Sequence, residues 1–394
     1  MVQVSAHDVK ESDMNATSLA VSVQPDAGMI VGVDLAKSVF QLCVADHHWR
    51  PIESQRLSRA QFERWFPNRT VARVVMEACG SAHHWARWLS SLGSEVTLLP
   101  ARYVRAYVQR NKTDAADAAA LLEAARCSEL RPVRVKSIEQ QALQALHRTR
   151  SLWQADRTRR INTLRGYCRE FGIAIGLGAR AGLEQIARVL AEPRSGIPDL
   201  LRPTMVLLVE EVRLLEARIA QLERELAASA RHSAACMTLM SVPGIGLLTS
   251  TAMAAATSGD VSHFKDARHF ASWFGLTPRE HSSGQHRQLG RISKQGDRYL
   301  RMLLTHGARS VLRAAAAARN AGKQVSGLRA WALGVQDRSN HNKACCALAN
   351  KLARIAYACL RDHANYDEDK PNSRLTKKKT DRLSFEMPAG PLAA

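Results

Sequence analysis

Four carboxylic acids in the first third of the chain have the residue types and positions of a metal site. Asp34 ends the apolar run Met29–Val33, and Glu77 ends a second apolar run, Val71–Met76. An acid at the tip of a buried strand is unfavourable unless a cation or a hydrogen-bond donor neutralises it. Asp114 and Asp117 follow in the stretch NKTDAADAAALLEAARC, which has the composition of a helix with a threonine N-cap at position 113.

These acids can converge although they are distant in sequence. Asp114 and Asp117 are three residues apart, so both face the same side of the helix. Oxygen ligands of this kind suit Mg²⁺ or Mn²⁺, and a pair of such ions can hold a phosphate during in-line displacement. Two other interpretations stay open, since the helix dipole also favours acids in a first turn and Asp34 could be a turn residue. Taken together, the four acids predict a metal site.

The composition points to a polyanionic partner. The chain has 394 residues, enough for two or three domains, and a formal net charge of +20. An excess of this size favours nucleic acid as the partner. The eight cysteines have neither metal-site nor disulfide-framework spacing, which is typical of a reduced cytosolic protein. No apolar run reaches about eighteen residues, so we expect no transmembrane helix, and we read Met1–Asp26 as a polar extension and not a targeting peptide.

A mixed sheet would position the strand acids. Met29–Val33 and Val39–Ala45 flank the polar break Lys37–Ser38 and predict a β-hairpin. Three antiparallel strands followed by a β-α-β unit, with acids on the first and fourth strands and on a later helix, form an RNase H-like plan. The remaining expected elements are a strand at His48–Leu57, a helix at Ser58–Phe66, a strand at Arg73–Met76, a helix at Ser81–Leu92 and a strand at Val96–Leu99.

The middle of the chain has helical patterns. A helical-looking stretch rich in arginine predicts a phosphate-contacting surface or, alternatively, a solvated helix face. Glycines in Phe171–Gly182 predict a hinge or loop. Further along the chain, apolar residues recur at spacings of three and four and form a seam along one helix face. This seam predicts a coiled coil or paired helix, within the chain or between protomers, with a single amphipathic helix as the alternative. The arginines are Arg148, Arg150, Arg157, Arg159, Arg160 and Arg165, and the seam is Met205, Leu208, Val212, Leu215, Ile219, Leu222 and Leu226.

The last third combines a glycine turn with a basic loop. The sequence VPGIG, with Gly244 and Gly246, has the form of a helix-hairpin-helix turn whose backbone N–H groups approach phosphate, or of a plain turn. The stretch GLTPREHSSGQHRQLGRISKQGDRYLR predicts loops that expose basic residues before a helix. A serine beside a glycine could act there as a nucleophile, although chemistry alone makes this a common loop pair. The nucleic-acid-binding candidates are Lys112, Gly244, Gly246, Arg279, Arg291, Lys294 and Arg298.

Several separate motifs, in one order, resemble a known family. One set of motifs resembles the N-terminal domain of the DEDD-type insertion-sequence transposases. This family is called insertion sequence one-ten, and the resemblance is to its eleven-eleven-like subgroup. The motifs are VGVDLAKSVF, VVMEACGSA and RNKTDAADAAAL. PGIG, FGLTPREHSSG and GRISKQGDRYLR resemble the C-terminal transposase domain of that family. The resemblance covers about Met29–Arg131 and Cys236–Leu360.

The resemblance implies a fold and a chemistry beyond what spacing shows. It implies a RuvC-type, RNase H-like domain in which Asp34, Glu77, Asp114 and Asp117 hold Mg²⁺, and a catalytic serine that matches Ser283. Members of the family act as RNA-guided serine recombinases on donor and target DNA, through a structured non-coding guide RNA. They are tetramers whose active sites combine the acidic domain of one protomer with the serine domain of another.

The function expected from these observations is that of a DNA transposase or recombinase. We expect a Mg²⁺- or Mn²⁺-dependent phosphoryl transfer on DNA, a homo-oligomer (dimer or tetramer), no membrane partner, and a cytoplasmic, nucleoid-associated location in a bacterium. The alternative is a metal-dependent RuvC-like junction resolvase that forms no covalent serine intermediate. An actin-like phosphotransferase and a non-catalytic nucleic-acid binder are weaker alternatives.

The expected organisation has five parts. Residues 1–27 form a disordered extension, 28–131 the RNase H-like DEDD domain, 132–235 a helical linker and coiled coil, 236–362 a mainly α C-terminal transposase domain with the serine loop, and 363–394 a disordered basic tail. The C-terminal helices are expected at Leu300–Ala318 and Lys343–Leu360.

Overall fold

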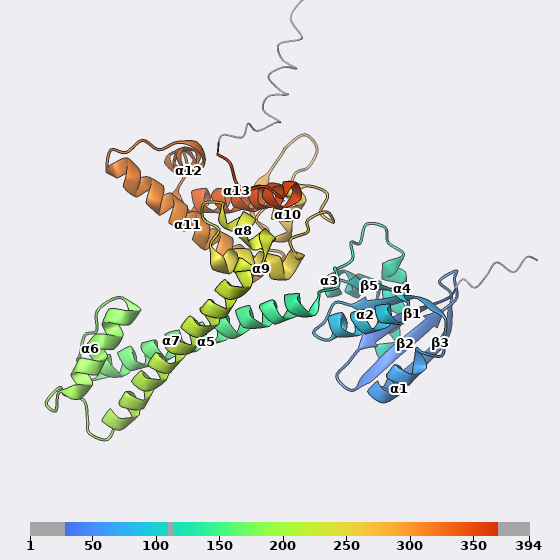
Figure 1. Cartoon of the computed structure of the whole chain (residues 1–394), viewed down its shortest axis with the longest axis horizontal. Coiled ribbons are helices and arrows are strands. Elements are labelled where there is room, and N and C mark those ends of the chain that lie inside the picture. Colours follow the sequence, from blue (N-terminus) through green and yellow to red (C-terminus); the bar gives the residue numbers. More distant parts are fainter. Residues whose placement is uncertain (1–27, 109–112, 369–394) are drawn as a thin grey trace, which may run out of the picture. The chain divides into compact units, whose positions relative to one another are not determined.

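The computed structural model describes residues 28–108 and 113–368, which form two compact units that divide between Val135 and Lys136 (Figure 1). The first unit is a mixed α/β domain and the second is mostly helical. The predicted α/β class with a helical C-terminal region is therefore confirmed. The finer boundaries within the second unit stay predictions, because the helical middle and the C-terminal region belong to one unit.

The first unit contains a five-stranded sheet with the order β3-β2-β1-β4-β5. The predicted hairpin is confirmed, since β1 and β2 pair antiparallel, and β3 continues that arrangement. β4 then pairs parallel with β1, and β5 pairs parallel with β4. The strands are β1 (Met29–Leu35), β2 (Val39–Ala45), β3 (Pro51–Ser58), β4 (Val71–Glu77) and β5 (Glu95–Leu99).

Helices cover both faces of this sheet. On one face, Val31, Val33 and Phe40 pack with aromatic residues of α1 (Arg59–Trp65) and α2 (Ala82–Ser91). On the other face lies α4 (Asp114–Ala125), which follows α3 (Ala101–Val104) and a 3₁₀ turn, η1 (Arg105–Tyr107). Ser58 caps α1, as the sequence predicts, with a reciprocal pair of hydrogen bonds to Gln61.

The second unit begins with three helices: α5 (Ile138–Glu170), α6 (Ala179–Ala191) and α7 (Arg202–Arg231). α5 and α7 pack antiparallel, because ion pairs join Arg150 to Glu223 and Arg157 to Glu216 along their length. Arg160 pairs with Glu211 in the same series. These three arginines are therefore partnered within the chain, whereas Arg148 and Arg159 of the same stretch are exposed, so the phosphate-contacting surface stays a prediction for those two residues.

Two details of the middle region differ from the sequence prediction. Val209, which the predicted seam omits, is buried in α7, whereas Leu208, which it includes, is half-buried and packs against the same core cluster. The predicted loop Phe171–Gly182 ends earlier than expected because α6 begins at Ala179. A Cβ at Gly182 would lie 2.6 Å from Nη2 of Arg165, so this glycine allows the arginine to approach the helix.

The rest of the second unit is a helical core with one small sheet. Its helices are α8 (Ala234–Met240), α9 (Leu247–Thr257), α10 (Ala267–Trp273), α11 (Arg298–Asn320), α12 (Gly327–Asp337) and α13 (His341–Asp362). The sheet is a hairpin of β6 (Pro278–Glu280) and β7 (Leu289–Ile292). Leucines and alanines of α11 and α13 form most of the shared core.

The described part of the chain extends beyond the expected start of the disordered tail. The backbone N–H of Tyr366 donates to Ser241 Oγ at 2.7 Å, and Glu368 Oε1 accepts from the N–H of Leu328 at 2.9 Å. Tyr366 and Glu368 are thus attached to the second unit, and the boundary at residue 363 stays a prediction. The predicted extension 1–27 and residues 369–394 lie outside the described residues. Within the described ranges, no helix has the length and apolar character needed to cross a bilayer.

Candidate active site

The two predicted strand acids lie at the carboxyl ends of neighbouring strands. β1 and β4 run parallel with Val33 opposite Met76, so the residues that follow in the two strands are Asp34 and Glu77. Both side chains are half-buried, and both residues make interactions with other groups. The parallel pairing of β1 with β4 therefore brings these two acids to one end of the sheet.

Both strand acids face α4. Side chains alternate along a strand, so Asp34 shares its face with Gly32. A Cβ at Gly32 would lie 2.5 Å from the carbonyl oxygen of Ala118, which places α4 directly over this face. Val75 packs in a core cluster with residues of α4 as well, and Glu77 lies two positions further along the same strand. Glycine at position 32 thus permits the close approach of the helix that carries the other two acids.

The predicted helix acids begin α4. Thr113 is the N-cap, as predicted, and its Oγ1 accepts from the N–H of Ala116 at 3.2 Å. Asp117 is half-buried and directly precedes Ala118, the residue that touches β1, whereas Asp114 is exposed at the first position of the helix. We call Asp34, Glu77, Asp114 and Asp117 the acid edge. Lys112, predicted to bind nucleic acid, lies outside the described residues.

The acid edge has the donor chemistry for a hard divalent cation, because all its members are carboxylates carried by neighbouring elements of one unit. Their side chains are not gathered, however. In the described residues, no group of three or more His, Cys, Asp or Glu side chains lies close enough together to hold a metal ion. Binding a cation here would therefore require these side chains to move toward one another.

The predicted basic loop of the second unit contains the β6–β7 hairpin. Ser283 and His286 exchange backbone hydrogen bonds of 3.2 and 3.1 Å, which leaves a two-residue turn. Gly284, at the first turn position, has φ +55°, the sign that a type II′ turn requires there. Because Ser283 and His286 lie opposite one another, their side chains project from the same face of the hairpin. Ser283 is exposed to solvent at this tip.

The structure separates the roles of the two adjacent serines. Ser282 Oγ donates to Glu280 Oε1 at 2.7 Å and accepts from the N–H of Gln288 at 3.2 Å, so it braces the hairpin. This hydrogen bond and the nearby Arg287 guanidinium lower the pKa of Glu280. In contrast, no hydrogen bond engages the Ser283 hydroxyl within the parts of the chain that the structure describes. Ser283 is therefore available for chemistry, and Ser282 is occupied.

Four predicted cations surround the hairpin, and all are exposed. Arg279 lies on β6 and donates weakly to Ser293 O at 3.4 Å, whereas Arg291 lies on β7. Lys294 is in the loop that follows, with φ +55°, and Arg298 begins α11. The loop before α11 packs closely against the end of α10, because a Cβ at Gly296 would lie 1.9 Å from the carbonyl oxygen of Trp273.

The two glycines of VPGIG have different environments. Gly244 has φ +88°, and a Cβ there would lie 3.0 Å from the carbonyl oxygen of Gly307 in α11. Glycine at 244 is thus required by packing between α11 and the turn that joins α8 to α9. Gly246 is exposed, precedes α9, and has no atom within 4 Å of a Cβ built on it. Of the two, Gly246 is the one with space for a phosphate.

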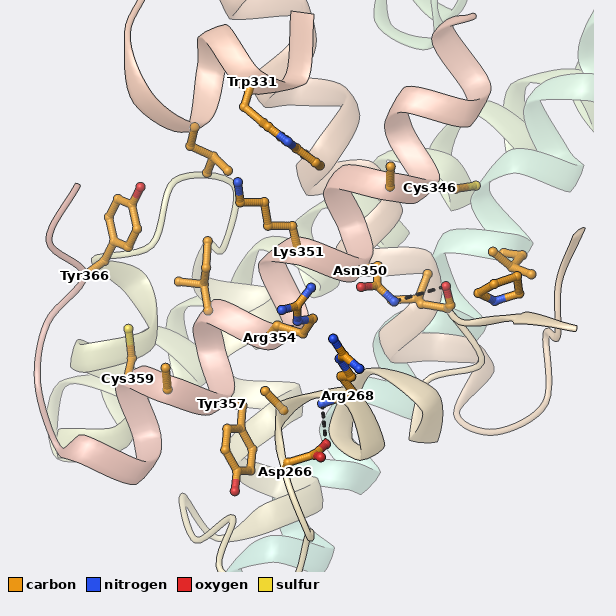
Figure 2. Close-up of a pocket in the computed structure, with 18 of the residues that line it drawn as sticks. Asp266, Arg268, Trp331, Cys346, Asn350, Lys351, Arg354, Tyr357, Cys359 and Tyr366 are labelled. Atoms are coloured by element: carbon orange, nitrogen blue, oxygen red, sulfur yellow. Dashed lines mark hydrogen bonds between the residues drawn. The ribbon is translucent and has the colours of Figure 1, made fainter. Parts of the chain in front are cut away.

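Some polar residues near the hairpin were missed by sequence reasoning. Arg268 on α10 and Asn350, Lys351 and Arg354 on α13 line a groove next to β6 and β7 (Figure 2). The sequence interpretation treats Lys343–Leu360 as an apolar core helix, which describes only one of its faces. The signal that could have found them is the spacing of the polar residues, which recur at three and four positions along this segment.

Comparisons with known proteins agree with this arrangement. The model of a family described as "Transposase", of the DEDD IS110 type, matches residues 31–172, and the model described as "Transposase IS116/IS110/IS902 family" matches residues 236–323. The "Probable family 20 transposase" of Pseudomonas aeruginosa is 43% identical over 331 residues, which is 84% of this chain and 96% of that protein. The "Transposase for insertion sequence element IS1111A" of Coxiella burnetii is 37% identical over 337 residues, covering 86% and 91% of the two chains.

The two family models and the two relatives define a DNA-cutting and DNA-rejoining enzyme of mobile elements. The chain belongs to the IS116/IS110/IS902 family of transposases, the family that its motifs resemble. Its activity is the movement of an insertion sequence, with DNA as substrate. This membership does not favour the alternative of a junction resolvase.

Proposed function

We propose that the chain transposes DNA through a covalent serine intermediate, with Ser283 as nucleophile and the acid edge as a site for Mg²⁺ or Mn²⁺. The observation that carries this proposal is the unequal use of two neighbouring hydroxyls. Both serines are exposed, but the Ser282 hydroxyl is engaged by Glu280 and by Gln288, whereas no hydrogen bond engages the Ser283 hydroxyl in the described residues. A nucleophile must have its hydroxyl free to meet a phosphate, and Ser283 satisfies that condition.

The proposed step balances without an added energy source. The Oγ of Ser283 attacks the scissile phosphorus, an Oγ–P bond forms, and the bond from phosphorus to the 3′-oxygen breaks. The proton lost by serine is matched by the proton that the 3′-oxygen gains. Since one phosphodiester replaces another, a 3′-hydroxyl of a second strand can reverse the step, release Ser283 and complete strand exchange without ATP.

The other residues of the site have supporting roles in this proposal. Arg279, Arg291, Lys294 and Arg298 are exposed around the hairpin and would hold the phosphate, the arginines through paired N–H donors. When bound by Asp34, Glu77, Asp114 and Asp117, a divalent ion would supply positive charge to the phosphate that reacts. The strand order 3-2-1-4-5, with antiparallel and then parallel pairing, supports an RNase H-like fold for the unit that carries these acids.

We further propose that a structured RNA from the element guides the reaction, that a dimer or tetramer carries it out, and that the protein associates with the bacterial nucleoid. The net charge of +20 supports a nucleic-acid partner. Assembly through α5 and α7, or a coiled coil between protomers, is part of this proposal.

The test is a trap for the covalent intermediate. Purified protein, Mg²⁺, the element's RNA and labelled donor and target DNA are incubated and separated under denaturing conditions. We expect a protein–DNA adduct that Ser283→Ala and Asp34→Asn abolish. Ser282→Ala is the matched control, and it should lower the yield but keep the adduct, because it removes a brace and not the nucleophile. Omitting the RNA should prevent adduct formation.

Other outcomes would change the proposal. DNA cleavage without an adduct, unaffected by Ser283→Ala, would support hydrolysis by a metal-activated water. An adduct that persists in Ser283→Ala but disappears in Ser282→Ala would transfer the nucleophile to Ser282. Full activity without RNA would rule out the proposed role of an RNA guide. Melting curves of each variant show whether a loss reflects unfolding.

A further inference from the structure

The second unit contains a groove of about 2370 Å³ beside the serine hairpin. Its walls come from α10, from the β6–β7 hairpin, from the start of α12 and from one face of α13, and Figure 2 shows the side chains that enter it. Small-molecule pockets have volumes of about 300–1000 Å³, so this groove is larger than a small ligand needs. Its size suits an extended polymer.

The charges that line this groove are predominantly positive. The basic residues are Lys265, Arg268, Arg291, Lys294, Lys343, Lys351, Arg354 and Arg361. The acidic residues are Asp266, Asp362, Asp367 and Glu368.

The acids of the groove are largely used for local structure. Asp266 caps α10 by accepting from the backbone N–H groups of Arg268 and His269. Asp362 forms an ion pair with Arg361, and Glu368 accepts from the backbone of α12. Asp367 also makes an interaction of its own. The positive charge of the remaining cations is therefore not compensated inside the groove.

Three cations gather in the middle of the groove. Arg268 and Arg354 extend into it from α10 and α13, and Lys351 lies one turn away from Arg354 (Figure 2). Throughout the ranges that the structure describes, no ion pair joins any of the three to a carboxylate. Like charges held together in this way repel one another, and an anion between them would relieve the repulsion.

Lys351 is fixed in position by an aromatic ring. Its Nζ lies 4.0 Å from the ring centroid of Trp331 on α12, a favourable cation–π arrangement. Burial, and then the nearby Arg354 guanidinium, lower the pKa of Lys351. The ammonium group is thus held in place without a carboxylate, as a preformed binding group would be.

The polar face of α13 is long enough to follow a strand. Lys343, Asn350 and Arg354 are spaced by seven and four residues, so they share one face of the helix. Lys343 and Arg354 are eleven residues apart, which is roughly 16 Å along the helix axis. That length corresponds to about five nucleotides at a rise of roughly 3.4 Å per phosphate in one strand. Between them lie small residues, Cys346 and Ala347, which keep the groove open.

The groove leads directly to the serine hairpin. A second, smaller cavity shares Arg268, Asn350 and Arg354 with the groove and is completed by Glu280 and Arg287 of the hairpin. The Nδ2 of Asn350 donates to Leu276 O at 3.3 Å, at the base of β6. A polymer in the groove would therefore pass along the strands of the hairpin that carries Ser283 at its tip.

We propose that this groove binds the sugar–phosphate backbone of a DNA strand next to the phosphate at Ser283, with Arg268 and Arg354 as the principal phosphate contacts. The proposal rests on the proposed role of Ser283 for the identity of the polymer, since the strand that continues to a DNA-cutting serine is DNA. Lys343 and Lys351 contact neighbouring phosphates of the same strand.

The test measures DNA binding by the full chain as a function of salt. The variant Arg268→Ala/Arg354→Ala is compared with Arg313→Ala/Lys323→Ala, which removes the same charge from exposed positions of α11 and the loop after it. A short labelled duplex is the probe. We expect the groove variant to bind at least about tenfold more weakly and to lower the salt slope of log K by about 1.8, at roughly 0.9 per lost phosphate contact. The control pair should bind like the unmodified chain.

Further measurements distinguish DNA from RNA as the occupant of the groove, and a loss of phosphate contacts from misfolding. If the groove variant lost affinity for a matching RNA but kept its DNA affinity and salt slope, the groove would hold RNA and the proposal would be overturned. Equal DNA binding by the groove and control variants would overturn it as well. Arg268→Lys/Arg354→Lys, which keeps the charge, should keep most of the salt slope, so a loss caused by misfolding would be recognised. Ser283→Ala should lose the covalent adduct and keep its DNA affinity. Failure of the serine proposal would therefore appear in the adduct assay, and failure of the groove proposal would appear in the DNA-binding assay.

Discussion

At the scale of single residues, two adjacent serines of this protein differ in their hydrogen bonds. Ser282 and Ser283 cannot be distinguished by composition, and the motif alone leaves their register open. In the folded hairpin, Ser282 accepts and donates, and Ser283 faces solvent. The distinction depends on Glu280 and Gln288, which reach Ser282 only after the two strands pair.

His147 is a buried residue with a structural role. Thr251 Oγ1 donates to Leu247 O at 2.6 Å, so it accepts from His147 Nε2–H at 3.0 Å. The other ring nitrogen, Nδ1, then accepts from the hydroxyl of Tyr299 at 3.1 Å. This network assigns the neutral tautomer and ties α5 to α9 and α11. Burial, and then the charge of Arg150, lower the pKa of His147 from 6.5 to about 4.

We predict that this histidine makes the protein less stable in weak acid. Because its pKa is lower in the folded than in the unfolded state, its contribution is fully present above pH 6.5 and is lost as the pH falls toward about 4. The expected loss of unfolding free energy is roughly 2 kcal/mol by pH 5. Urea unfolding at pH values between 7 and 5 measures this loss of unfolding free energy. The variant His147→Gln, which lacks the titrating ring, is the control. Parallel pH dependences for the two proteins would contradict this assignment.

At the scale of elements, the sequence predicts the sheet better than the helices around it. Apolar runs with polar breaks locate β1, β2, β4 and β5 to within a few residues, because buried strands need such runs. The hairpin at Pro278–Ile292 was expected as loops, since exposed residues on both of its faces leave no apolar alternation. α12 was not predicted at all, and only the face of α13 that packs in the core was recognised.

The pairing of α5 with α7 shows a limit of local patterns. Arg157 lies in a run of basic residues, and its partner Glu216 lies 59 residues further along the chain. A pattern of charge in one segment cannot reveal that a second segment neutralises it. For that reason, the basic stretch alone leaves open a phosphate-contacting surface or a solvated helix face, and does not reveal the partners of Arg150, Arg157 and Arg160.

We predict that the Arg157–Glu216 pair stabilises this helical hairpin. The guanidinium Nε lies 2.7 Å from Oε1, and the side chain of Arg157 is only 19% exposed. Glu216→Arg should lower the melting temperature by placing like charges together, and the exchanged variant Arg157→Glu/Glu216→Arg should recover most of it. A double-mutant cycle should give a coupling of about 1 kcal/mol. Strictly additive effects on unfolding would show that the pair contributes nothing.

At the scale of the whole molecule, the candidate residues are divided between two units with separate cores. The acid edge belongs to the first unit, whose core clusters are formed by its own sheet and helices. The serine hairpin and the groove belong to the second. The acids could be named from the sequence because they end predictable strands and begin a capped helix. The groove could not, because α10 and α13 meet only through tertiary packing.

We predict that the first unit folds alone. A fragment of residues 28–135 contains both faces of the sheet and their covering helices, so it should show a cooperative melt and mixed α/β circular dichroism. A shorter fragment, 28–108, is the control. It lacks α4 and would expose Ile30, Cys43 and Val75 on one face of the sheet. Equal stability of the two fragments would mean that α4 is not part of this fold.

The dual character of α13 has a consequence for how a partner can be bound. Leu348 and Leu352 of this helix are fully buried in the main core, while Asn350 and Arg354 line the groove on the opposite side. A close-packed interior resists deformation, so the groove cannot widen without disturbing the residues that hold the unit together. Lys351 then loses little conformational entropy on binding, because the ring of Trp331 already holds its ammonium group. The adaptation of shape must come from the strand, which bends to fit a rigid surface.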